Sequence, residues 1–225
     1  MKTTIIAGAL LALGLTLPGM AAAASCSPAR GQTGAFDYYV LSLSWSPAFC
    51  ATPAGAKHPD QCGAEVPKHG FVVHGLWPQY AAGSAAQQQN RSLWPQCCGG
   101  ASFDPAAVPA ALDGVMIGDD LRRHEWDKHG TCATTAPAPY FQSVAETVAK
   151  IGLAPKLSGE APPARIKISE LKTNFPVPAN ALYPTCKGKK LSEVHICLDK
   201  GLNPTACPPE TRQQDKCPGT VTLAP

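Results

Sequence analysis

Ten cysteines constrain the fold of this chain more than any other feature of its sequence. All of them follow residue 25, and an even number of cysteines is typical of a disulfide framework, here of up to five bonds, in an oxidising compartment. They form no paired C-x-x-C set, which argues against a metal cluster. The spacing leaves most pairings open, although Cys50 and Cys62 flank a loop rich in Pro, Gly and Ala and are expected to close it.

The first 24 residues have the features of a cleaved signal peptide. Lys2 supplies a positive charge, an apolar run extends from Ile5 to Leu17, and small residues precede a cleavage site after Ala24. A weaker alternative is a lipid attached to Cys26. The apolar run is too short to span a membrane well, and no later run is long enough to do so. We therefore expect a secreted or periplasmic protein.

Residues 25–225 are long enough to form one domain with its own core. Loss of Lys2 with the signal peptide lowers the net charge from +3 to +2. This balance does not indicate a nucleic-acid coat or a membrane binder, so a polyanionic substrate would have to be held by a local site. We find no internal repeat and no linker between domains. We expect a single-domain monomer that does not bind membranes.

Sequence periodicity predicts three strands and two helices. Residues 36–45 alternate as in a strand that is buried on one face, and residues 71–76 and 191–198 predict two further strands. His195, in the last strand, is expected to be structural or exposed. Apolar residues three or four positions apart predict an amphipathic helix over 140–151. A weaker helix is expected over 105–117.

The densest group of titratable side chains lies in residues 124–132, HEWDKHGTC. At about 100° per residue in an α-helix, Glu125 and His129 lie roughly 40° apart. Lys128 lies about 60° to the other side of Glu125, with His124 one step beyond it. All four side chains therefore share one face of the predicted helix. Such a face favours chemistry over packing.

Two other interpretations of this segment remain. It can be a solvated helix end with i,i+4 pairs, such as His124 with Lys128. It can also be a zinc site, but a metal-binding HExxH motif has its histidines four residues apart, whereas His124 and His129 are five apart. Asp119 and Asp120 are expected to cap the start of the helix, and Gly130 to end it in the left-handed conformation. Trp126 projects away from the polar face and is expected in the core.

His74 is the second histidine in an unusual setting. It belongs to the strand at 71–76, where Val72, His74 and Leu76 are expected on one face before a break at Trp77-Pro78. Two histidines from different elements can act as general acid and general base. A nearby lysine can neutralise the charge that builds on an anionic group. Cleavage of an RNA phosphodiester by its own 2′-OH needs such a set.

Four segments, in this order along the chain, resemble the ribonuclease T2 family. They are FDYYVLSLSW at 36–45, FVVHGLWPQY at 71–80, HEWDKHGTC at 124–132 and CKGKKLSEVHIC at 186–197. The second and third resemble the two active-site segments of that family, and each is specific. The resemblance covers most of the chain after the signal peptide. It implies an α+β fold of the ribonuclease T2 type, with a central, mostly antiparallel sheet flanked by helices.

The resemblance also implies an endoribonuclease that cleaves single-stranded RNA without a metal or other cofactor. The products would be 2′,3′-cyclic phosphates, which are then hydrolysed more slowly to 3′-phosphates. Matched residue by residue, His74 and His129 are the acid–base pair, with His129 favoured as the base and the direction left open. Glu125 and Lys128 would steady the pentacoordinate phosphate. From its position four residues before His129, Glu125 can orient that imidazole, or donate a hydrogen bond if it is protonated. His124 would bind a phosphate oxygen.

Other features of the resemblance concern the base and the disulfides. Trp77 resembles a residue that stacks on a base, and a core tryptophan is an equal alternative. Many relatives have an aromatic pair where this chain has Leu121 and Arg122, and an acid where it has Gln79, which leaves the base preference open. The implied disulfides join Cys132 to Cys97 or Cys98, and Cys186 to Cys197.

Two functions compete with this interpretation. The first is a secreted RNA-binding protein that keeps the fold without catalysis, but the whole matched set of site residues is present. The second is a metal-dependent phosphodiesterase. That enzyme would need a carboxylate-rich site, whereas the carboxylates of this chain are few and scattered.

Overall fold

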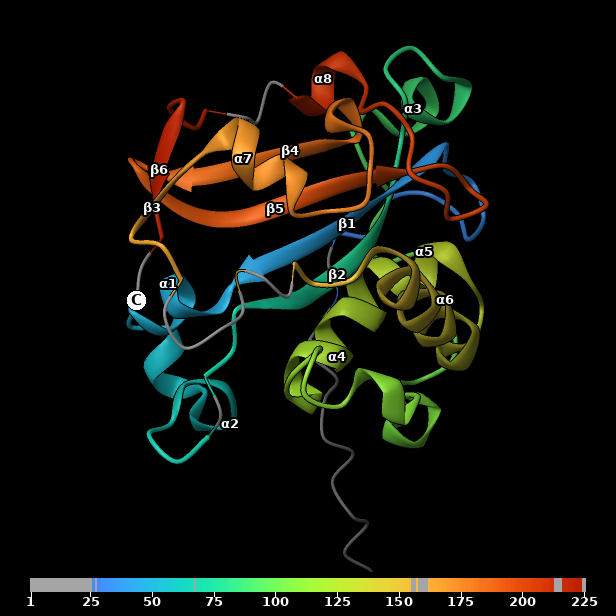
Figure 1. The fold of residues 1–225 in the computed structure, drawn as a ribbon. Coiled ribbons are helices and arrows are strands. Elements are labelled where there is room, and N and C mark those ends of the chain that lie inside the picture. The colour runs from blue at the N-terminus through green and yellow to red at the C-terminus, as the bar shows by residue number, and fades with distance from the viewer. Residues whose placement is uncertain are drawn as a thin grey trace, which may run out of the picture.

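The structure, a computed structural model, describes residues 26, 28–66, 68–154, 157, 162–212 and 216–223. The expected signal peptide, residues 1–24, lies outside them. In the described part, helices pack beside a six-stranded sheet, as Figure 1 shows, which confirms the α+β fold class. No helix in this part of the chain is long and apolar enough to cross a membrane.

The sheet has the strand order β2-β1-β5-β6-β3, and β4 pairs with β5. The pairings are antiparallel apart from a short parallel one between β5 and β6, so the expected mostly antiparallel sheet is confirmed. The strands are β1 (Tyr38–Trp45), β2 (Phe71–Gln79), β3 (Arg165–Lys167), β4 (Leu182–Lys187), β5 (Lys190–Leu198) and β6 (Thr220–Thr222).

The helices are short except for α6, the amphipathic helix that the periodicity predicts. The α-helices are α1 (Ser46–Cys50), α2 (Pro59–Cys62), α3 (Ala85–Asn90), α4 (Asp119–Glu125), α5 (Thr131–Ala133), α6 (Pro137–Ile151), α7 (Ile168–Thr173) and α8 (Pro209–Arg212). Single turns are η1 (Gly55–Lys57), η2 (Pro105–Ala107), η3 (Ala110–Leu112), η4 (Trp126–Gly130) and η6 (Ala179–Ala181). The helix expected over 105–117 is wrong. Pro109 interrupts that segment because it lacks an N–H donor, and the turns η2 and η3 form instead.

Strand β1 is buried on both faces, so the expectation of burial on one face is wrong. Leu41 and Leu43 pack in the main core together with the inner face of α6. On the opposite face, Val40 belongs to a second cluster that includes Tyr183 and Cys197. Side chains of β4 and of the C-terminal region thus cover the face that the alternation had assigned to solvent.

Strand β2 lies at the edge of the sheet and runs through Trp77 and Pro78 to Gln79, where a break was expected. An edge strand tolerates proline because its outer side has no partner strand. The pairing with β1 shifts at one point, since Gly75 pairs with Ser42 but Val73 with Leu43. The extra residue in this β-bulge is His74.

The bulge changes which residues share a face of β2. Leu76 and Val73 both pack in the main core, although an uninterrupted strand would place them on opposite faces. The grouping of His74 with Leu76 is therefore wrong. His74 is turned out of the core, toward the face of the sheet that carries Trp77.

Five disulfides join the described cysteines, and none of these cysteines is free. The pairs are Cys26–Cys97, Cys50–Cys62, Cys98–Cys132, Cys186–Cys217 and Cys197–Cys207. The expected closure of the loop by Cys50 and Cys62 is confirmed, as is the bond of Cys132 to one of the adjacent cysteines. The disulfide of Cys26 excludes a lipid on its sulfur.

The expected pair Cys186–Cys197 is wrong. Cys186 packs against the main core, whereas Cys197 belongs to the second cluster on the other face of the sheet. The sheet therefore separates the two sulfur atoms, and each bonds to a cysteine of the C-terminal region.

Candidate active site

The segment 124–132 is not one regular α-helix. Helix α4 ends at Glu125, a single π-helical turn (η4) follows, and α5 begins directly after it. Gly130 keeps a right-handed φ of −60° and does not end the helix, so that expectation is wrong. A Cβ on Gly130 would lie 2.5 Å from Trp126 and 2.9 Å from Tyr140, so close packing requires this glycine. π-Helical turns are rare and often lie at functional sites.

The helix is held in place by its apolar side. It begins at Asp119 as expected, but the N-cap is Gly118, and no side chain caps the first turn. Trp126 is fully buried, as expected, and its indole N–H donates to the carbonyl of Ala101 at 2.8 Å. Tyr140 of α6 bonds through its hydroxyl to the backbone of Leu76 in β2. These contacts fix the helices beside the edge strand.

The two motif segments meet at a cavity of about 230 Å³. Its lining residues are Val40, His74, Trp77, Gln79, Trp94, Lys128, His129 and Tyr183. The structure thus brings four of the six predicted site residues to one cavity. Glu125 is buried next to it, hydrogen-bonded to Trp77. His124 is exposed and does not line the cavity.

The ring of His74 lies between two carboxylates. Its Nδ1 is 2.7 Å from Oε1 of Glu193, and its Nε2 is 3.5 Å from Oε1 of Glu125. Burial lowers the pKa of His74, but the hydrogen bond and the two negative charges outweigh burial and the opposing charge of Lys128, so the pKa is raised above its usual value. Since 35% of the side chain is exposed, a protonated His74 remains accessible to a ligand.

Glu125 contacts Trp77 and His74. The indole N–H of Trp77 donates to its Oε2 at 2.6 Å, and the side chain is only 1% exposed. Burial is the main cause that raises the pKa of Glu125 to about 7, against the effects of His74, Trp77 and Lys128. The expectation that Glu125 orients His129 is not borne out, because its hydrogen-bond donor among the described residues is Trp77.

His129 has the opposite electrostatic setting to His74. Burial holds the pKa of His129 well below its usual value, and the charges of Lys128, His124 and His74 add to this effect. The ring packs on Trp77, with centroids 5.3 Å apart and planes 30° apart. Its Nδ1 is buried and finds no hydrogen-bond partner among the described residues. A neutral ring of this kind can accept a proton.

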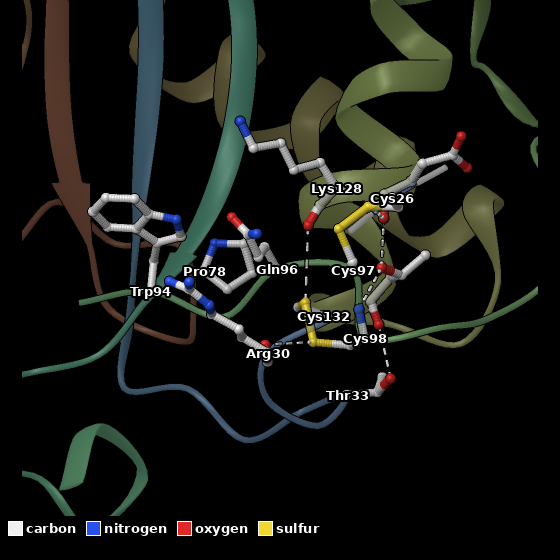
Figure 2. Close-up of a disulfide and its surroundings, with 12 residues drawn as sticks. Cys26, Arg30, Thr33, Pro78, Trp94, Gln96, Cys97, Cys98, Lys128 and Cys132 are labelled. Carbon is white, nitrogen blue, oxygen red and sulfur yellow. Dashed lines mark hydrogen bonds between the residues drawn. A yellow bond between two sulfur atoms is a disulfide. The ribbon is translucent and has the colours of Figure 1, made fainter. Parts of the chain in front are cut away.

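Lys128 and His124 bring positive charge to the site. Figure 2 shows the Lys128 side chain extending from its helix toward β2. Burial and the nearby charges of Lys128 and His74 lower the pKa of His124. The carbonyl of Lys128 accepts from the N–H of Cys97 at 2.9 Å. Figure 2 shows this carbonyl beside the Cys98–Cys132 disulfide. Covalent and hydrogen bonds therefore fix the backbone that carries Lys128.

Sequence reasoning missed Glu193. His195 was expected to be structural or exposed, and the structural alternative holds, because the residue is 4% exposed. Its Nε2 lies 3.0 Å from Oε2 of Glu193, and its Nδ1 2.8 Å from the hydroxyl of Tyr183. The alternation of β5 places Glu193 and His195 on one face, opposite the apolar side chains of Val194, Ile196 and Leu198. Two polar side chains on a central buried strand are the signal that could have identified them.

Close packing explains why a glycine, Gly75, lies between His74 and Leu76. A Cβ at this position would collide with the carboxylate of Glu125 and lie 2.5 Å from Nε1 of Trp77. Gly75→Ala should therefore displace Glu125 and lower kcat/KM for RNA by about 10²-fold, the scale expected for a misplacement of roughly 1 Å. Gly219→Ala is the matched control, since nothing lies within 4 Å of its Cβ position. Equal activity of the two variants would contradict this role of Gly75.

Known proteins resemble this chain in sequence and in fold. A ribonuclease of Aeromonas hydrophila is 31% identical over 208 residues, which cover 85% of each chain. Ribonuclease DdI of Dictyostelium discoideum is 26% identical over 212 residues, 84% of this chain and 85% of that one. The solved structure of an RNase-related protein from Calystegia sepium matches with a TM-score of 0.61 at 22% identity, covering 84% of this chain and 97% of that one.

A comparison with models of protein families identifies the family of this chain. The profile of the Ribonuclease T2 family matches residues 36–207, which include both motif segments and β4 and β5. Sequence, fold and the meeting of the two motifs at one cavity agree. The chain belongs to the Ribonuclease T2 family.

Proposed function

We propose that the chain is an endoribonuclease that cleaves single-stranded RNA to 2′,3′-cyclic phosphates and then to 3′-phosphates. The observation that carries this proposal is the pair of histidines at one cavity whose pKa values are shifted in opposite directions, His129 down and His74 up. Such a pair supplies a base and an acid at the same pH, which suits a reaction that removes one proton and adds another. Membership of the Ribonuclease T2 family supports the same activity.

In the first step His129 is the base and His74 the acid. Neutral His129 takes the proton from the 2′-OH, and the 2′-oxygen attacks the adjacent phosphorus. The bond from phosphorus to the 5′-oxygen breaks, and His74 gives its Nε2 proton to the departing oxygen. The accessible Nε2, opposite the anchored Nδ1, supports this direction. His129 is left protonated and His74 neutral.

The second step uses the same groups in reverse. Neutral His74 takes a proton from water, which attacks the cyclic phosphate, and protonated His129 returns its proton to the 2′-oxygen. The product is a 3′-phosphate, and both rings regain their first protonation states.

The other site residues stabilise the phosphorane. Lys128 and His124 donate hydrogen bonds to phosphoryl oxygens on which charge builds. Glu125, with a pKa of about 7, can donate a hydrogen bond to such an oxygen while protonated, and as a carboxylate it stabilises protonated His74. The low exposure of Glu125 supports both roles, because water competes little for its carboxyl group.

An aromatic wall of the cavity is suited to bind a base. Trp77, Trp94 and Tyr183 line it, and stacking on aromatic rings accepts any base at about 1–3 kcal/mol. Because Glu125 occupies the indole N–H of Trp77, that side chain offers its ring rather than a hydrogen bond. DNA should not be cleaved, because it lacks the 2′-OH nucleophile.

The pH dependence of kcat/KM should be bell-shaped. The rate rises with pH as His129 loses its proton and falls at higher pH as His74 loses its proton. Since the pKa of His129 lies below 6.5 and that of His74 above it, the plateau should include pH 6.5. Initial rates on a dinucleotide from about pH 4 to about pH 9 measure both limbs. A flat profile would exclude two titrating histidines.

Product analysis in excess EDTA tests the whole proposal. Digested RNA should carry 2′,3′-cyclic phosphates, detected by mass spectrometry, and chelation should not change the rate. Among the described residues no group of three or more His, Cys, Asp or Glu could hold a metal ion. Products with 5′-phosphates would contradict the 2′-OH route, and loss of activity on chelation would favour a metal-dependent enzyme. Binding of RNA without cleavage in any buffer would favour the noncatalytic alternative.

We further propose that residues 1–24 are a signal peptide and that the remaining chain acts as a secreted or periplasmic monomer. The five disulfides support export to an oxidising compartment. The exported protein should begin at Ser25 and elute as a monomer in size-exclusion chromatography with light scattering. A mature protein that retains residues 1–24 would contradict the cleavage.

A further inference from the structure

We propose that Glu193, held by Ser44 and His195, is the positioning residue for His74 and fixes its ring so that Nε2 faces the cavity. The inference rests on the proposed function in treating His74 as the acid of the first step. Glu193 lies 119 residues from His74 in sequence, and the sheet brings them together. Glu193 pairs across β5 and β1 with Ser44, which pairs across β1 and β2 with Val72. The bulge then carries His74 to the same face.

The hydrogen bonds around Glu193 converge on its carboxylate. Ser44 donates to Oε1 at 2.9 Å, and Nδ1 of His74 lies 2.7 Å from the same oxygen. Nε2 of His195 lies 3.0 Å from Oε2. If the Tyr183 hydroxyl donates to Nδ1 of His195, then Nε2 of His195 carries the proton that Glu193 accepts. One neutral tautomer of His195 therefore satisfies the whole chain of contacts.

Three donors to one carboxylate keep Glu193 ionised. Although burial alone would raise the pKa of Glu193, the hydrogen bonds from His195 and His74 and the charge of protonated His74 hold it far below its usual value. Glu193 therefore does not take a proton from His74. It stabilises the protonated ring and selects the tautomer with a proton on Nδ1 when the ring is neutral.

The two carboxylates beside His74 thus have different tasks. Glu125 accepts one hydrogen bond, from Trp77, and has a pKa of about 7, so its charge changes near neutral pH. Glu193 stays negative throughout. Lys128 of the neighbouring helix opposes protonation of His74, and the charge of His74 in turn lowers the pKa of His124 and of His129. A histidine that must give and regain a proton needs a fixed anion on the nitrogen that does not react.

Glu193→Gln removes the charge and nearly keeps the shape. We expect kcat for a dinucleotide to fall by about ten- to a hundredfold with KM changed little, as when an outer carboxylate that orients a histidine is lost. The alkaline limb of the pH profile, and the pKa of His74 measured by ¹⁵N NMR, should move down by about one unit. Glu146→Gln is the matched control, since Glu146 is an exposed carboxylate on α6 that accepts from Gln142. It should leave both readings unchanged.

Wild-type kcat and an unshifted pKa of His74 in Glu193→Gln would overturn the proposal. A purely structural role would lower the melting temperature without moving the pKa of His74 in the folded protein. If Glu193→Gln does not fold, Glu193→Asp takes its place, because it keeps the charge but withdraws it from Nδ1. A wild-type Nδ1 shift in that variant would overturn the proposal equally. The NMR readings do not need activity, so a chain that fails to cleave RNA would refute the proposed function while Glu193 is still tested.

Discussion

His129→Asn should lower kcat/KM for RNA by about 10²- to 10⁴-fold, the usual contribution of a general base. Asparagine keeps much of the buried side-chain volume but cannot take the 2′-OH proton. His74→Ala should lower the rate on a similar scale, because the 5′-oxygen would depart without a proton. Steady-state rates on a dinucleotide measure both losses. Near-normal activity of either variant would reject its assigned role.

Two controls separate lost chemistry from lost structure. His58→Ala removes a histidine that does not line the cavity and should keep the wild-type rate. RNA binding, measured by fluorescence anisotropy, should persist in His129→Asn, because Lys128 and the aromatic wall remain. A variant that neither binds nor melts at the wild-type temperature would point to disrupted folding instead.

The double variant of His74 and His129 should be little slower than the slower single variant. The two rings act on one transition state, so once one is lost the other contributes much less than it does in the intact site. Multiplicative losses would mean that the rings act in separate events. This comparison tests whether the opposite pKa shifts belong to one mechanism.

Local sequence patterns predicted those parts of the site that depend on local structure. The strand with His74, the helix with Glu125, Lys128 and His129, and the buried Trp126 follow from periodicity and motif spacing. The β-bulge and the π-helical turn could not be predicted, because each shifts the register by contacts with distant elements. For the same reason, the sequence did not predict that Glu125 would accept a hydrogen bond from Trp77 instead of orienting His129.

The role of Glu193 could not be predicted from local sequence patterns either, because it depends on pairing across the sheet. Its side chain is ordinary in sequence and acquires its setting only when β5 pairs with β1 next to the bulge of β2. Disulfides 186–217 and 197–207 follow from which face of β4 and β5 each cysteine occupies. Because a bulge reverses the faces of a strand, an error in register changes the predicted disulfide partner as well.

Removal of the Cys98–Cys132 disulfide is the second change that should have a large effect, both on stability and on catalysis. Changing both cysteines to alanine should lower the free energy of unfolding by about 2–5 kcal/mol. It should also lower kcat in the protein that stays folded, because Cys132 follows the turn that carries Lys128 and His129. The carbonyl of Lys128 is bound by Cys97, whose neighbour would no longer be tied to α5 (Figure 2). Chemical denaturation and rates per folded molecule measure the two losses.

The Cys50–Cys62 disulfide supplies the matched control for this variant. It joins residues 12 apart, against 34 for Cys98–Cys132, so chain entropy predicts a stability loss smaller by about 1 kcal/mol. Neither Cys50 nor Cys62 lines the cavity, and kcat per folded molecule should stay at the wild-type value. An unchanged kcat per folded molecule in both double variants would mean that the disulfides contribute only to stability. A loss confined to Cys98–Cys132 would mean that this bond also holds the acid–base pair in register.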